Sequence, residues 1–212
     1  MLAMTQLIGF GAARNPLTLR FIAYLGHESD GIANLSLPAG AQAGDLAVAS
    51  VQTFGGSLVT PSGWTTLFSN TSVREARGAC KILDGTETSA NFNSGSTTFT
   101  DGGVAIFRPS RSLGSLAVGG WQSQGTSGNP TAQTVTSGSG AAPLVVIGLA
   151  HTAAGTLSGF STASPAFDDV LSDNPEFFMG YKIYNSGPVN HSIDMDDGGS
   201  NNVLASGYIQ VS

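Results

Sequence analysis

The chain has 212 residues, of which only 10 % are charged, against roughly 25 % in an average soluble domain. Its 41 % of apolar residues favours a folded core over a disordered low-complexity tract, despite 29 glycines, 26 serines and 19 threonines. The net charge of −6 argues against nucleic acid and anionic membrane as partners. No apolar run is long enough to span a bilayer, and the single cysteine, Cys80, excludes an intrachain disulfide.

The N-terminal stretch superficially resembles a secretion signal. It has no positive charge before Arg14, and Thr5 and Gln6 interrupt its apolar residues, so we expect an ordinary first strand there. Further along, short apolar bursts alternate with Gly, Ser, Asn and Pro, which is typical of antiparallel β proteins. Strands are predicted at 5–10, 17–25, 33–37, 45–53, 78–83, 96–100, 104–108, 115–123, 131–135, 144–151, 177–184, 191–195 and 204–211.

The two halves of the chain carry a weak internal echo. The matching blocks are 43–51 with 141–149, 79–85 with 180–186, and 102–110 with 205–212. The offset between them grows slightly along the chain, as loop insertions would cause. We therefore predict an all-β, antiparallel β-sandwich or jelly roll of about a dozen strands. It would form a single domain over 1–212, with pseudo-repeated halves of about 1–112 and 113–212 that face each other as two sheets.

Three residues have simple structural interpretations. Asp45 follows Ala-Gly before an apolar strand, where its carboxylate can cap backbone N–H groups of a tight turn. Trp64 follows a Pro-Ser-Gly turn that directs it towards the core or an end cap. Arg108 ends its strand and can pair with an acid or lie in a subunit contact.

The order of short motifs resembles a family of tailed-bacteriophage virion structural proteins. The motifs are IGFGAA, LPAGAQAGDLAVA, PSGWTTL, KILDGTET and GGVAIFR, followed in the second half by PLVVIGLA and GYKIYNSG. Members look like β-sandwich modules on phage heads, tails and fibres. The resemblance implies a virion component of head-decoration, head-fibre or tail-fibre type. It carries over no catalytic residue and does not settle the place on the particle.

No catalytic or metal-binding motif stands out. His27, His151 and His191 are never at ligand spacing, and His151 is expected at a strand end. Adjacent residues of the GHESDG segment point in different directions and do not make a triad, because triads are assembled from distant segments. No Gly-x-Ser-x-Gly elbow, Walker loop or Rossmann fingerprint is present.

The segment 194–202, DMDDGGSNN, is the sharpest acidic cluster. Read as a Ca²⁺ loop, with Asp194, Asp196 and Asp197 as weak candidate ligands, it lacks two oxygen ligands of the standard pattern. A solvated hairpin turn is the favoured alternative. Half of the acids follow residue 167, whereas seven of the eight bases precede residue 112, so complementary faces are available for docking subunits.

We therefore expect a non-enzymatic structural protein, located in the virion and assembled in the host cytoplasm. It would attach to a capsid or tail lattice as a homo-oligomer, with a trimer as one option, and without a required cofactor. Its N-terminal IGFGAARNP segment and Ser/Thr-rich strand faces would supply low-charge contact area. The alternatives are a tail-tip or fibre module, or a lectin-type carbohydrate- or receptor-binding protein in which Trp64, Trp121 and Tyr181 contact the ligand beside Ca²⁺. A polysaccharide depolymerase ranks third.

Overall fold

The computed structural model describes residues 16–31, 33–93, 99–137, 143–152, 160, 162–185, 188–195 and 201–212. The predicted strand at 5–10, the IGFGAA motif, and residues Asp196 and Asp197 lie outside this part. No helix in the described part is long and apolar enough to cross a bilayer.

The first half forms one large and one small antiparallel sheet. The large sheet has five strands in the order β1-β7-β3-β5-β4, and the small sheet pairs β2 with β6. The bounds are β1 (Leu19–Asp30), β2 (Asn34–Ser36), β3 (Leu46–Thr53), β4 (Thr65–Asn70), β5 (Glu75–Ile82), β6 (Ser89–Asn91) and β7 (Phe99–Pro109).

The second half also forms one large and one small antiparallel sheet. Its five-stranded sheet has the order β12-β13-β10-β15-β8, and its three-stranded sheet the order β11-β14-β9. The bounds are β8 (Leu116–Thr126), β9 (Gln133–Ser137), β10 (Leu144–His151), β11 (Thr162–Ser164), β12 (Asp169–Asn174), β13 (Phe177–Tyr184), β14 (Val189–Asp194) and β15 (Asn202–Val211).

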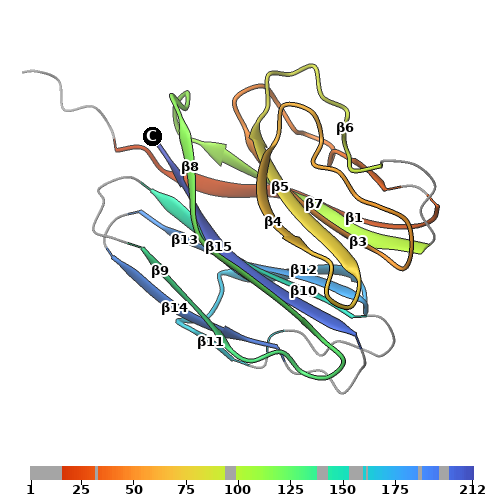
Figure 1. Cartoon of the computed structure of the whole chain (residues 1–212). Coiled ribbons are helices and arrows are strands. Elements are labelled where there is room, and N and C mark those ends of the chain that lie inside the picture. Colours follow the sequence, from red (N-terminus) through yellow and green to blue (C-terminus); the bar gives the residue numbers. More distant parts are fainter. Residues whose placement is uncertain are drawn as a thin grey trace, which may run out of the picture.

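The two large sheets face each other, and a small sheet covers the outer face of each (Figure 1). A central core lies between the large sheets, and a separate apolar core lies under each small sheet. Strands β3 and β10 are buried at every position because each lies between two cores. Alternate residues of β3 therefore serve different cores: Leu46 and Val48 face the centre, and Ala47 and Ala49 face the small sheet.

The all-β, antiparallel prediction is confirmed, with one difference in layering. We predicted one sandwich of two sheets, whereas the small sheets add an outer layer on each side. The two large sheets have the same strand order when the second is read from its other edge. The first is β1-β7-β3-β5-β4, and the second, read in this way, is β8-β15-β10-β13-β12. This equality agrees with the predicted pseudo-repeat, which remains a prediction. The halves are joined at residues 110–115, between β7 and β8.

All four outer strands of the two large sheets carry a register shift. The shifts lie in the pairings of β1 with β7, β4 with β5, β12 with β13 and β8 with β15. By contrast, β3 and β10 pair with both neighbours without interruption. Bulges at sheet edges disfavour the addition of a further strand from another chain. The outer strands therefore disfavour extension of either large sheet by a strand from another chain.

Several strand glycines lie directly under aromatic rings. A Cβ atom at Gly78 would overlap the Phe68 ring, one at Gly180 the Phe167 ring, and one at Gly207 the Trp121 ring. The missing side chain leaves the space in which the ring of a neighbouring strand or loop packs. These glycines are thus part of the core packing.

Candidate functional site

The three aromatic residues predicted to contact a ligand lie in different places. Trp64 is buried in the outer core of the first half, against the small sheet. Tyr181 is buried in the central core and stacks on Phe21, with ring centroids 5.1 Å apart. Trp121, on β8, stacks on Phe68 at the opposite edge of the central core. The structure does not bring the three together into one binding surface.

Residues 194, 195, 201 and 202 of the acidic segment lie in the described part of the chain. Asp194 is the last residue of β14 and is half-buried, and its two companions lie outside the described residues. Because β14 and β15 belong to different sheets, they do not pair as a hairpin, and the hairpin prediction was wrong. Among the described residues, no three His, Cys, Asp or Glu side chains gather as a metal site would require. A Ca²⁺ site stays a prediction.

The three histidines are also separated. His151 is the last residue of β10, as predicted, and is fully buried. His191 lies in the outer core of the second half, where its Nδ1 is 3.0 Å from the Tyr184 hydroxyl. Burial there lowers the pKa of His191, with a smaller contribution from Lys182. His27 lies on the outer strand β1, opposite Gly102.

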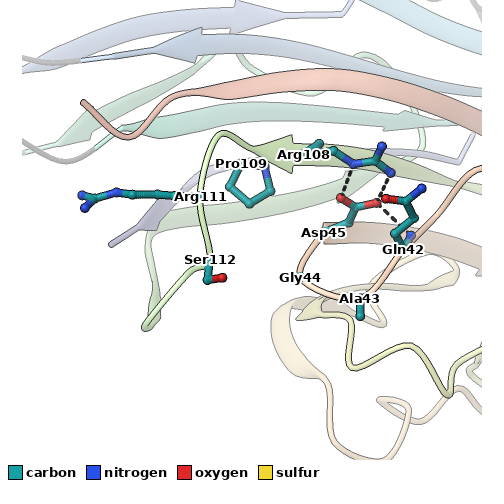
Figure 2. Close-up of a pocket in the computed structure, with 8 residues that line it drawn as sticks. All are labelled: Gln42, Ala43, Gly44, Asp45, Arg108, Pro109, Arg111 and Ser112. Atoms are coloured by element: carbon teal, nitrogen blue, oxygen red, sulfur yellow. Dashed lines mark hydrogen bonds and ion pairs between the residues drawn. The ribbon is translucent and has the colours of Figure 1, made fainter. Parts of the chain in front are cut away.

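A pocket of about 210 Å³ lies where the loop before β3 meets the end of β7 (Figure 2). Arg108 donates from Nε and Nη2 to the two carboxylate oxygens of Asp45, both at 2.8 Å. Asp45 also accepts a hydrogen bond from the backbone N–H of Gln42 at 2.9 Å. The turn and ion-pair predictions for Asp45 and Arg108 are therefore confirmed. Arg111 extends away from this pair and also lines a second pocket of about 370 Å³ beside the chain end.

The ion pair at this pocket therefore has a structural role, in which it connects two segments of the fold. Two of the pocket's three charged groups, Asp45 and Arg108, are bound to each other, whereas Arg111 points away from them. The hydrogen bonds with Asp45 raise the pKa of Arg108. Bidentate pairing fixes the loop before β3 to the last residues of β7.

A buried hydrogen-bonded chain crosses the central core, and the sequence analysis missed it. Ser50 Oγ lies 2.9 Å from Nε2 of His151, and Nδ1 of His151 lies 3.2 Å from Oδ1 of Asp101. The other oxygen of Asp101 accepts a hydrogen bond from Nε2 of Gln52 at 2.7 Å, and that nitrogen also donates to the carbonyl of Thr152 at 2.7 Å. We call these five residues the polar chain.

The polar chain joins the two halves, because Ser50, Gln52 and Asp101 belong to the first half, and His151 and Thr152 to the second. It lies at the end of the sandwich where β3 and β10 finish, which we call the polar end. Buried hydrogen bonds are directional, so they fix how the two large sheets are placed against each other.

Ser50, His151 and Asp101 have the order and contacts of a nucleophile, a base and an orienting acid. All three side chains, however, have an exposed fraction of 0 %. A nucleophile must contact the substrate, and in this conformation Ser50 contacts only protein. In the described structure these three residues are therefore part of the buried core and have a structural role.

Cys80, whose thiol is also a potential nucleophile, is buried in the central core as well. Burial raises its pKa to about 12, which keeps it as a thiol at neutral pH.

Further charged groups surround the polar chain. Arg74 is buried beside the Phe54 ring, with its guanidinium carbon 2.9 Å from the ring centroid. Burial lowers the pKa of Arg74 to about 10, against the opposing effect of Asp101 and Glu176. The pKa of the Glu176 carboxyl is raised, first by burial and then by Asp101. The polar end thus holds charges that are partly removed from water.

A signal for the polar chain was present in the sequence. Along β3, the residues on the central face are Leu46, Val48, Ser50 and Gln52, so an apolar alternation changes to polar residues within one buried strand. The partners could not be identified, because Asp101 and His151 are 51 and 101 residues away from Ser50.

The chain was compared with protein-family models, curated proteins and solved structures, and nothing in any of the three sets matches it.

Proposed function

We propose that the protein is a non-enzymatic structural component of a tailed-phage or phage-like particle, which attaches to the capsid or tail lattice through a surface that is poor in charge. The proposal rests on the motif order described above and on one feature of the surface. Every exposed side chain on β4, β8, β9 and β14 is uncharged. We call this surface the neutral flank; its residues are Thr65, Thr66, Ser69, Ala117, Gly120, Gln122, Thr134, Thr136, Asn190 and Ser192.

The neutral flank is continuous across both halves. Strand β4 lies beside β8, β8 beside β9, and β9 pairs with β14. Surfaces buried in assemblies are depleted in Lys, Glu and Asp, because long charged side chains lose conformational entropy and hydration when they are covered. A neutral flank of this kind supports attachment as the role of the surface.

The opposite side of the molecule has a different surface. Strands β1 and β12 expose Arg20, Glu28, Asp169 and Asp173. Charged residues on outer strands keep such strands in water and away from other chains. The contrast favours the neutral flank over this side as the attachment surface.

The first experiment is to purify particles of the phage that encodes the chain and to count its copies by imaging and quantitative mass spectrometry. Hundreds of copies would support head decoration, and a handful a tail-tip or fibre position. Absence from purified particles would overturn the proposal. Binding on a glycan array that is lost with EDTA and with Trp64→Ala would support the lectin-type alternative instead.

Variants with added charge test the neutral flank itself. Thr134→Lys and Asn190→Lys place a charge on exposed positions of β9 and β14, so we expect the purified variants to fold normally but to be lost from particles. Val170→Lys, at an exposed position on β12, is the matched control and should be retained. Equal incorporation of all three variants would contradict attachment through this surface.

A further inference from the structure

At the polar end, three uncharged side chains each have a buried oxygen atom that makes no hydrogen bond within the described part of the chain. These atoms are the hydroxyl oxygen of Tyr24, Oε1 of Gln52 and Oγ1 of Thr152. Gln52 and Thr152 have exposed fractions of 0 %. Buried polar atoms are almost always hydrogen-bonded to protein or to ordered water, so these three call for a partner.

Asp101 links these groups through its hydrogen bond with Gln52 and through its place on β7. The amide of Gln52 is fixed between Asp101 and Thr152 by its two hydrogen bonds of 2.7 Å. The Tyr24 ring packs on Gly103, two residues from Asp101 and directly opposite Ser50 in the sheet. Gln52 thus contacts both Asp101 and Thr152, and the Tyr24 ring lies over the backbone of β7 two residues from Asp101.

The chemistry of these atoms identifies the partner. The hydroxyl groups of Tyr24 and Thr152 can donate or accept a hydrogen bond, whereas Oε1 of Gln52 only accepts. Burial raises the pKa of Tyr24, with contributions from Asp173 and Asp101, so its hydroxyl keeps the proton that it donates. A partner that both donates and accepts satisfies all three atoms, and water does so with the usual two to four bonds.

A metal cation is a poorer match. The cationic Arg74 already interacts with Asp101 and Glu176, and a second cation close to them would be repelled by its guanidinium. The hydroxyl protons of Tyr24 and Thr152 would also have to turn away from the ion.

We propose that Tyr24, Gln52 and Thr152 form a binding site for internal water, which completes the polar chain between the two halves. This inference does not depend on the proposed function. It makes the polar end a hydrated part of an otherwise apolar interface. The hydrogen-bonded path then runs from Ser50 through His151, Asp101 and Gln52 to the water.

The test is a crystal structure of the full chain at a resolution that shows ordered water. We expect a water oxygen about 2.7–3.2 Å from at least two of the three side-chain oxygens. The site would be disproved if all three bond directly to protein atoms, or if the density is a metal ion with short oxygen contacts.

Thr152→Val removes one hydroxyl with little change in shape and should displace or disorder the water. Thr53→Val is the matched control, because Thr53 is equally buried but donates to the carbonyl of Gly55 at 2.8 Å. In that variant the water should remain. A water that persists unchanged in Thr152→Val would contradict the role of this hydroxyl, and the wild-type structure decides the matter if the variant does not fold.

Discussion

The two ends of the central core hold the halves together by different means. At the end where β3 and β10 begin, Phe107 packs against the rings of Phe21 and Tyr181, at centroid distances of 6.0 and 5.2 Å. At the polar end, Ser50 and Asp101 are bound to His151. Apolar burial is strong but does not depend on direction, whereas hydrogen bonds require particular partners at particular angles. The aromatic end therefore stabilises the contact between the two halves, and the polar end fixes how one half is oriented against the other.

The largest effect is expected from Asp101→Leu at the polar end. The substitution removes the acceptor for His151 and Gln52, and each buried polar group left without a partner costs about 1–3 kcal/mol. We therefore expect a loss of about 2–6 kcal/mol in the free energy of unfolding, measured by chemical denaturation. A loss below about 1 kcal/mol would show that the polar chain contributes little.

Phe107→Ala probes the aromatic end. Phe107 is fully buried, and truncation of such a ring costs about 3–5 kcal/mol through lost burial and the cavity that remains. Phe107→Leu should cost clearly less, because it leaves a smaller cavity. The contrast between the ends predicts that Phe107→Ala lowers stability without changing the ring environment of His151 in NMR spectra, whereas Asp101→Leu changes both. Equal changes at His151 would argue against two separate ends.

Ser50→Ala is a smaller change at the polar end. It removes one partner of His151 and leaves its Nε2 buried, which should cost about 1–3 kcal/mol. Ser69→Ala, on the exposed side of β4, is the control. It removes only a solvent-exposed hydrogen bond from Arg77 at 3.1 Å and should stay within about 0.5 kcal/mol of wild type. If the two serine variants are equally stable, the contact between Ser50 and His151 contributes nothing to stability.

The smallest effect concerns pH. The pKa of Glu176 is raised from its ordinary value of 4.5 in the folded protein, so the folded state holds its proton more tightly than the unfolded chain does. The stabilisation is fully present below the ordinary pKa and is lost as pH rises through the folded pKa. Glu176→Gln should flatten the decrease in stability above pH 4.5. An unchanged pH profile would show that the carboxyl titrates alike in both states.

The sequence was informative where a structure is local. Asp45, Arg108 and Trp64 behave as their neighbours predicted, since a tight turn and a strand end are determined by a few adjacent residues. The outer strands β4 and β12 were not predicted. Their register shifts insert extra residues and break the alternation of period two by which strands are recognised, as between Thr66 and Phe68.

The polar chain could not be predicted for a different reason. Its members come from three strands and from the residue that follows β10, and only the packing of one large sheet on the other brings them together. A polar residue in an apolar strand indicates that a partner exists, but it does not identify that partner. Burial changes the meaning of such residues, because hydroxyl, imidazole and carboxylate groups that suggest chemistry on a surface serve as connectors inside a core.

The glycines under aromatic rings have a consequence for how the sequence can vary. Every substitution of Gly78, Gly180 or Gly207 adds a Cβ atom that meets a ring, so no replacement at these positions is conservative. Gly40 and Gly44 differ, because a Cβ there meets open space and only their positive φ angles restrict them. Natural variants should therefore keep the first group invariant and accept Asn in the second. The many glycines of this chain therefore include positions at which almost no other residue fits.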